Sequence, residues 1–190
     1  MNVAGLVLAA GSGSRLGHPK ALVQVGAERL VDRAVRTLRA GGLDPVVVVL
    51  GAALTEVPGA TVAENPDWES GMGSSLRVGL AAMPAGAGAA MVYLVDQPDV
   101  GPAAVARLAA AFEAGAVVAV ASYSGRRGNP VLLARSTWPE VSRLAQGDVG
   151  ARPFLAAYPE LVTPVPCDDI ADPTDIDTPE DLARRRSAPD

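Results

Sequence analysis

Leu8-Ala-Ala-Gly-Ser-Gly-Ser-Arg-Leu-Gly-His-Pro-Lys20 begins at the end of an apolar run over residues 3–8, and this junction is the most informative part of the chain. The run predicts a buried strand, and the glycines predict a loop that turns sharply where the strand ends. Gly11 and Gly13 lack a Cβ, so backbone N–H groups there can approach an anion closely. Arg15 and Lys20 add full positive charges to the same loop. The stretch therefore predicts a phosphate-binding loop.

The loop differs from the two commonest phosphate-binding patterns. A dinucleotide loop requires G-x-G-x-x-G, but Leu16 stands at the third glycine position and Gly17 comes one residue late. A Walker loop requires a hydroxyl residue directly after its lysine, but Ala21 follows Lys20. Lys20 is also the only lysine among 16 basic residues. A compact ammonium kept at this position suits a contact with phosphate.

Composition limits the classes of protein that the chain can belong to. With 190 residues, of which 49% are hydrophobic and 19% charged, we expect a single domain over residues 1–190 with one core. The net charge of −5 argues against binding to nucleic acid or to an anionic membrane. Cys167 is the only cysteine, which excludes an intrachain disulfide and favours a cytoplasmic protein. Pro84 and several glycines interrupt the uncharged residues 79–95, so we expect no membrane segment.

The order of the expected elements indicates an α/β fold with a mostly parallel central sheet and a small hairpin insertion. Strands are expected over residues 46–50, 61–63, 90–95 and 116–121, with a possible edge strand over 161–165. Helices are expected over residues 29–40, 76–83, 103–114, 138–145 and 151–157. Ser74 or Ser75 is the expected cap of the second of these helices. Residues 123–133 predict the hairpin, turning at Gly125-Arg-Arg-Gly128.

Acidic residues are placed where the expected sheet would bind a ligand. Asp96 follows the strand over residues 90–95 directly, and ligands of open α/β sheets bind beyond the carboxyl ends of the strands. Asp175 and Asp177 precede a last helix, for which we expect Thr178 as the cap and Pro179 at the first position. This pair has two interpretations: carboxylates that hold Mg²⁺, or charges that favour the start of the helix.

Together, these groups suit transfer of a nucleotide. The cationic loop would hold the β and γ phosphates of a triphosphate, while Mg²⁺ on one or two carboxylates would neutralise the α phosphate. An acceptor phosphate could then attack the α phosphorus in line and release pyrophosphate. No covalent protein nucleophile is required.

Six blocks of the sequence resemble those of the molybdenum cofactor cytidylyltransferases. They are Leu8-Ala-Ala-Gly-x-Gly-x-Arg-x-Gly-x-Pro-Lys20, Asn65-Pro-x-Trp-x-x-Gly-Met-x-x-Ser-Leu-Arg-x-Gly-Leu80, Leu94-x-Asp-Gln-Pro98, Gly128-Asn-Pro130, Gly147-Asp-x-Gly-Ala-Arg152 and Asp175-Ile-Asp-Thr-Pro-Glu-Asp-Leu182. The first and last blocks are shared by many nucleotidyltransferases, whereas the middle blocks are more specific. The resemblance implies a three-layer, Rossmann-like nucleotidyltransferase fold.

The resemblance also implies an activity and roles for individual residues. The activity is Mg²⁺-dependent transfer of CMP from CTP to the terminal phosphate of molybdopterin bearing molybdenum, with transient delivery of the product to a molybdoenzyme or its chaperone. Arg15 and Lys20 would hold the triphosphate, and Asp96 would act with them in catalysis. Asp96 and Asp177 would hold Mg²⁺. The implied nucleotide-binding set is Leu8, Ala9, Ala10, Gly11, Gly13, Arg15, Lys20, Gly71, Ser75 and Asp96, and the implied pterin-binding set is Asn129, Asp148 and Arg152.

The sequence leaves alternatives open. Ala9-Ala10-Gly11 favours CTP, since the branch that uses GTP usually has Ala-Gly-Gly there. The generic first and last blocks also fit a nucleotidyltransferase for a sugar, polyol or organic-acid phosphate. A non-catalytic carrier of the molybdenum cofactor would need the loop but not the carboxylates. His18 is assigned no role.

Overall fold

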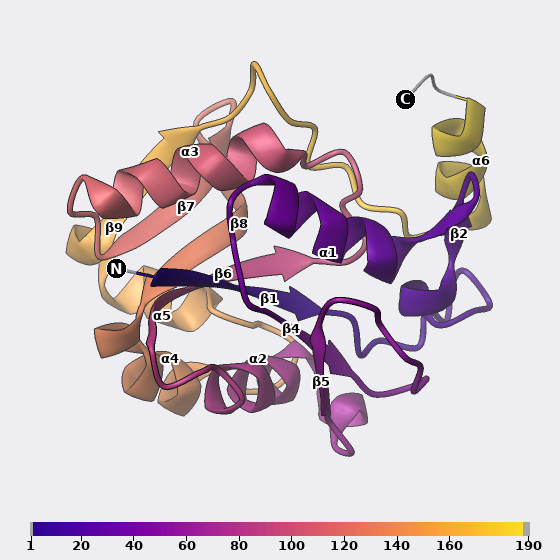
Figure 1. Ribbon diagram of the computed structural model, residues 1–190, viewed down its shortest axis with the longest axis horizontal. Coiled ribbons are helices and arrows are strands. Elements are labelled where there is room, and N and C mark those ends of the chain that lie inside the picture. The colour runs from indigo at the N-terminus through magenta and orange to yellow at the C-terminus, as the bar shows by residue number, and fades with distance from the viewer. Residues whose placement is uncertain (1, 188–190) are drawn as a thin grey trace.

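The computed structural model describes residues 2–187, which form a three-layer α/β fold around one seven-stranded sheet (Figure 1). The strands lie in the order β5-β4-β1-β6-β8-β7-β9. Neighbouring strands are parallel except on either side of β8, which pairs antiparallel with both β6 and β7. The strands of this sheet are β1 (Asn2–Leu8), β4 (Val46–Leu50), β5 (Thr61–Glu64), β6 (Ala87–Leu94), β7 (Val118–Tyr123), β8 (Arg126–Ala134) and β9 (Val162–Pro166). The expected fold class is confirmed.

The first strand explains why helices cover both faces of the sheet. From Val3 onward its residues are apolar without alternation, and successive side chains of a strand point to opposite faces. Val3 and Val7 belong to the core beneath helices α1 (Leu30–Ala40) and α3 (Pro102–Glu113). Leu6 and Leu8 belong to the core beneath helices α2 (Met72–Ala81), α4 (Trp138–Leu144) and α5 (Arg152–Ala157). The two cores lie above and below the sheet in Figure 1.

Apart from α2, the helices begin and end close to the expected positions. Their bounds are α1 (Leu30–Ala40), α2 (Met72–Ala81), α3 (Pro102–Glu113), α4 (Trp138–Leu144), α5 (Arg152–Ala157) and α6 (Pro179–Ser187). The side chain of Thr178 accepts a hydrogen bond from the Asp181 backbone N–H, and Asp181 accepts one from the Thr178 N–H, which is the expected cap of α6. No helix within residues 2–187 is long and apolar enough to cross a membrane.

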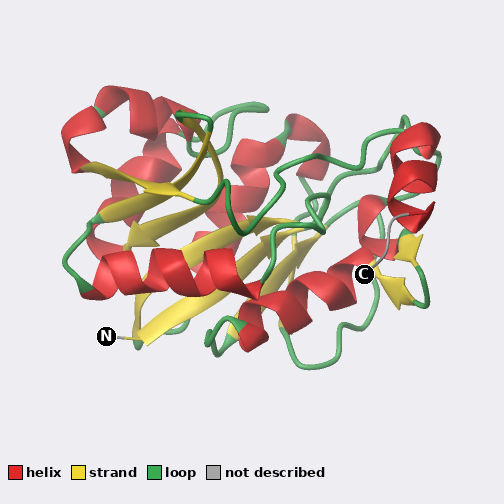
Figure 2. Ribbon diagram, turned by 90° about the horizontal axis from the view of Figure 1, so that it is seen from above, coloured by secondary structure: helices red, strands yellow, loops and turns green. Residues whose placement is uncertain are grey.

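The parallel strands bring distant loops to one end of the molecule. The chain leaves β1 and β6 at the same edge of the sheet because these two strands are parallel neighbours. A small two-stranded sheet, β2 (Gln24–Val25) with β3 (Glu28–Arg29), and helix α6 lie beside each other at that end (Figure 2). Arg186 of α6 donates to the backbone carbonyl of Gln24 at 2.9 Å, which joins the two segments.

Two local predictions are wrong. Helix α2 begins at Met72, four residues earlier than expected, because Gly71 adopts a positive φ of 109° that ends the preceding turn. Its N-cap is Gly71, which has no side chain to accept a capping hydrogen bond, and Ser74 and Ser75 lie inside the first turn. The hairpin turns at Ser124-Gly125, where both φ angles are positive, as a tight two-residue turn requires. The arginines expected in the turn therefore belong to β8.

The hairpin is also built into the main sheet and does not project from it, since β8 pairs with β6 as well as with β7. The expected edge strand is confirmed as β9, which pairs with β7 at the end of the sheet and contains Pro164 and Pro166.

Candidate active site

A cleft of about 850 Å³ lies beyond the carboxyl ends of β1 and β6. Segments that are distant in sequence form its walls: the glycine-rich loop, the turn after β6, the start of α2, the hairpin of β7 and β8, residues 148–152 and residues 173–177. Of the residues that the sequence indicated for the nucleotide or metal, those that line the cleft are Leu8, Ala9, Ala10, Gly11, Arg15, Lys20, Gly71, Ser75, Asp96 and Asp177. The structure thus brings nearly the whole set together.

Gly13, the remaining member, shapes the loop from within. Its φ is 60°, and a Cβ at this position would lie 2.0 Å from the backbone carbonyl oxygen of His18. The Gly13 carbonyl also accepts hydrogen bonds from the N–H groups of Leu16 and Gly17, at 2.8 and 2.9 Å. The loop therefore closes only with glycine here. The side chain of His18 does not line the cleft.

The first residues of the loop have backbone donors that face the cleft without a protein acceptor. Within residues 2–187, the N–H groups of Gly11 and Ser12 donate to no protein acceptor, and both residues line the cleft. A Cβ added at Gly11 would meet no atom within 4 Å, so packing does not require glycine at this position. A glycine at position 11 would allow a ligand to approach the backbone closely.

Lys20 connects the loop to both expected metal ligands. Its Nζ atom lies 2.5 Å from Oδ2 of Asp96 and 2.5 Å from Oδ1 of Asp177. Arg15 Nη2 lies 2.9 Å from the other carboxylate oxygen of Asp177. The cations and carboxylates expected to share a triphosphate and a metal therefore form one network.

Charge within the network perturbs its pKa values. Burial disfavours the charged form of Lys20, but attraction to Asp96 and hydrogen bonds to Asp177 and Asp96 outweigh it and raise the lysine pKa. The hydrogen bond from Lys20 lowers the pKa of Asp177. Burial, followed by the nearby charge of Asp96, raises the pKa of Asp175. At neutral pH the cleft thus holds a charged lysine between carboxylates.

This donor set fits a divalent cation. Asp96 and Asp177 each direct an oxygen at the same positive group, so their carboxylates converge on a point that already carries positive charge. No cluster of three or more metal-binding side chains exists within residues 2–187. Mg²⁺ characteristically uses one or two carboxylates and completes its shell with water and substrate phosphates. The two carboxylates would hold such an ion together with a bound triphosphate.

A buried asparagine organises the wall near Ser75. Asn65 Nδ2 donates to the hydroxyl oxygens of Ser74 and Ser75, at 2.8 and 3.0 Å, while its Oδ1 accepts from the Asp67 N–H at 3.0 Å. Asn65, Ser74 and Ser75 are each at most 4% exposed. Ser75 is therefore held rigidly at the edge of the cleft.

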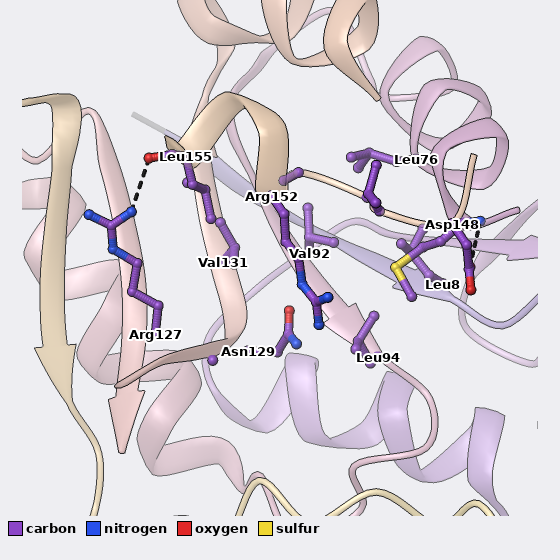
Figure 3. Close-up of a pocket in the computed structure, with 15 residues that line it drawn as sticks. Leu8, Leu76, Val92, Leu94, Arg127, Asn129, Val131, Asp148, Arg152 and Leu155 are labelled. Carbon is purple, nitrogen blue, oxygen red and sulfur yellow. Dashed lines mark hydrogen bonds between the residues drawn. The ribbon is translucent and has the colours of Figure 1, made fainter. Parts of the chain in front are cut away.

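A second, smaller cavity of about 150 Å³ opens beside the cleft and contains the expected pterin-binding residues (Figure 3). Its floor is apolar and includes Leu76, Val92 and Val131. Asn129 from β8 and Arg152 from the start of α5 point toward each other across it. Asp148 also lines the cavity, but its carboxylate accepts a hydrogen bond from the Met72 N–H at 3.2 Å and so favours the start of α2.

Several residues that the sequence did not single out also line these cavities. Arg127 lines both and donates to the Leu155 carbonyl at 3.0 Å, while Arg126, Tyr123 and Gln97 line the larger cleft. The adjacent arginines were visible in the sequence, but their assignment to a turn removed them from the site. Asp175, one of the paired acids, accepts a hydrogen bond from Gln97 at 2.8 Å and not from Lys20.

The fold and the cleft define a three-layer α/β protein with a large cleft at the carboxyl edge of its sheet. Residues 5–162 match the model of the MobA-like NTP transferase domain, and the chain belongs to that family. It is a nucleotidyltransferase of the MobA-like family.

Relatives of the chain carry different functional names. It is 38% identical to nicotine blue oxidoreductase of Paenarthrobacter nicotinovorans, over 96% of this chain and 95% of that protein. It is 32% identical to molybdenum cofactor guanylyltransferase of Rhodobacter capsulatus, over 100% of both chains. The crystal structure of Rv0371c from Mycobacterium tuberculosis in complex with manganese matches with a TM-score of 0.82 and 27% identity, over 99% of this chain and 100% of that one.

Proposed function

We propose that the protein transfers CMP from CTP to the terminal phosphate of molybdopterin bearing molybdenum and releases pyrophosphate. The observation that carries this proposal is the joining of two unlike cavities. Leu8, Leu94, Asn129 and Arg152 line both, so a ligand in the cationic cleft would face a ligand in the apolar cavity directly. A nucleotide and an acceptor with a flat ring system and a phosphate match this division.

The cationic side of the cleft would bind and orient the nucleotide. The free N–H groups of the loop, Arg15 and Lys20 would hold the β and γ phosphates. Asp96 and Asp177 would hold Mg²⁺, which when bound supplies positive charge to the phosphate oxygens. Lys20, whose ammonium lies at both carboxylates, would stabilise the negative charge that develops on the leaving pyrophosphate.

The apolar cavity would position the acceptor. Arg152 and Asn129 would orient it from the rim, placing an oxygen of its phosphate in line with the α phosphorus. A bond forms between this oxygen and the α phosphorus while the bond from the α phosphorus to the bridging oxygen breaks. Both reactants being held, the step needs no protein nucleophile.

The choice of CTP rests on the loop sequence. Ala10 is buried and lines the cleft, so its methyl group narrows the space that the glycine expected in the GTP-using branch would leave open. GTP is the alternative nucleotide, and the similarity to a molybdenum cofactor guanylyltransferase favours it.

Pyrophosphate release tests the proposal. The protein is incubated with Mg²⁺, molybdenum-loaded molybdopterin and one nucleoside triphosphate at a time. We expect release with CTP and formation of the cytosine dinucleotide. Release with GTP alone would assign the protein to the guanylyl branch, and release with a sugar, polyol or organic-acid phosphate would change the acceptor.

Two alternative functions, a cofactor carrier and a redox enzyme, involve no nucleotide transfer. A cofactor carrier would need no carboxylate pair, so Asp96→Asn should abolish turnover only if the protein is a transferase. The similarity to a relative named nicotine blue oxidoreductase makes a redox activity the second alternative. The pairing of two carboxylates with Lys20 and Arg15 favours transfer, because hydride transfer requires no metal-binding carboxylate pair.

A further inference from the structure

The two expected metal ligands come from different parts of the chain, and both lie outside regular structure. Asp96 belongs to the turn after β6, whereas Asp177 belongs to the loop before α6. The sheet therefore does not fix their separation. A metal site requires its ligands to be held within about 0.5 Å of the productive geometry, so other contacts must join the two loops.

Gln97, the neighbour of Asp96, makes such a contact. Its Nε2 donates to the Pro173 carbonyl at 3.0 Å and to Oδ1 of Asp175 at 2.8 Å. The Gln97 side chain thus spans 76 to 78 residues of sequence to reach the loop that carries Asp177. Gln97 is only 6% exposed, so water competes little for these donors.

The turn that carries Gln97 is itself firmly held. The Tyr93 hydroxyl lies 3.0 Å from the Gln97 carbonyl and 2.8 Å from the Val100 carbonyl, and Tyr93 is 2% exposed. On the other side, the Ile176 N–H donates to the Asp96 carbonyl at 2.8 Å, and the Ile176 side chain is buried in the core. Gln97 connects these two anchored segments directly by its side chain, whereas Lys20 bridges them from the glycine-rich loop.

A neutral amide suits this position. Asp96, Asp175 and Asp177 surround it, so a carboxylate would add repulsion, and a lysine would compete with Lys20 for the metal-binding pair. An amide provides two donors without charge.

We propose that Gln97 is a positioning residue that sets the separation of Asp96 and Asp177, and that Asp175 is its anchor and not a metal ligand. The inference rests on the proposed function, because it takes that carboxylate pair to be the metal site. Residues that orient metal ligands from outside the coordination shell commonly contribute 10- to 100-fold to metal affinity.

Manganese titration tests this inference. Mn²⁺ is titrated into the full chain with CTP and no acceptor, and its dissociation constant is measured by calorimetry. Gln97→Met fills the same space without donors, and Asp175→Leu removes the acceptor from the other side. Both should weaken Mn²⁺ binding about tenfold or more. Asp175→Asn keeps an acceptor oxygen and should bind Mn²⁺ within about threefold of the native affinity.

Two controls separate positioning from general damage. Gln24→Met changes an exposed glutamine on β2 and should leave Mn²⁺ affinity unchanged. CTP affinity measured in EDTA should stay native in all variants, since the glycine-rich loop is untouched. If one of the two disruptive variants does not fold, the other still reports on the same hydrogen bond.

The outcomes decide the inference either way. The inference is overturned if both Gln97→Met and Asp175→Leu bind Mn²⁺ with native affinity. It is also overturned if Asp175→Asn loses as much Mn²⁺ affinity as Asp175→Leu, because Asp175 would then be a metal ligand. If CTP fails to bind but another triphosphate does, the proposed function is contradicted while the inference about Gln97 still stands. The titration is then run with that triphosphate.

Discussion

Replacing Lys20 by methionine should destabilise the folded protein because it leaves two carboxylates without their shared cation. The side chains of Lys20, Asp96 and Asp177 are 19%, 17% and 27% exposed, so solvent screens the pair only partly. Breaking a fully buried ion pair costs 3–5 kcal/mol and an exposed one about 0–1 kcal/mol, and we expect about 2 kcal/mol here. Arg15 compensates Asp177 weakly, because its side chain is 69% exposed. The melting temperature should fall by about 4–8 °C.

The pH dependence of this loss identifies its cause. Lys20 lowers the pKa of Asp177 below its ordinary 3.8, so this contribution to stability is complete above 3.8 and is lost as the pH falls through the lower folded value. The pKa of Lys20 is raised above 10.5, so its contribution is complete below 10.5 and is lost only as the pH rises through the higher folded value. The difference between the native protein and Lys20→Met should therefore be constant from pH 5 to 9 and shrink below pH 4.

Urea unfolding followed by circular dichroism measures this difference at each pH. Lys20→Arg serves as the control, since it keeps the positive charge and should recover most of the stability while losing turnover with the compact ammonium. Equal stability of Lys20→Met and the native protein at pH 7 would refute the reasoning. A difference that persists undiminished at pH 2.5 would show that the loss has another origin.

Three further changes separate the parts of the site. Gly13→Ala should destabilise the protein by about 3 kcal/mol or more, measured by urea unfolding, because the added Cβ would lie 2.0 Å from the His18 carbonyl at a positive φ. Arg152→Met should raise the KM for the acceptor at least tenfold without changing the dissociation constant of CTP. An equal change in both constants would contradict the assignment of Arg152 to acceptor binding. Gly79→Ala should cost about 1–3 kcal/mol of stability through its contact with Leu6 and leave the kinetic constants of the folded enzyme native.

Local sequence signals predicted the elements that bury apolar runs. The five residues of β4 have no polar position, and the structure buries all of them. The convergence of the glycine-rich loop with Asp96 also followed from sequence, because both lie after parallel strands. The hairpin turn was misplaced because Gly-Arg-Arg-Gly and Ser-Gly are both acceptable turns, and pairing of β8 with β6 selects the second.

Contacts between distant loops could not be predicted in the same way. The hydrogen bond from Gln97 to Asp175 depends on how the segment after β9 returns to the turn after β6, and no local pattern encodes that path. The paired acids looked equivalent in sequence, yet one faces Gln97 and the other faces Lys20. Side chains two residues apart in a loop diverge according to backbone angles that only the packed structure determines.

The prolines of β9 hinder the addition of strands from other molecules at this edge of the sheet. The Cys167 N–H donates to the Ser122 carbonyl of β7, so odd-numbered positions of this segment direct their N–H groups inward and even-numbered positions face outward. Pro164 and Pro166 occupy two of these outward positions and have no N–H to offer. A strand from a second molecule would find too few donors to extend the ladder at this edge, which lowers the tendency to aggregate by strand addition.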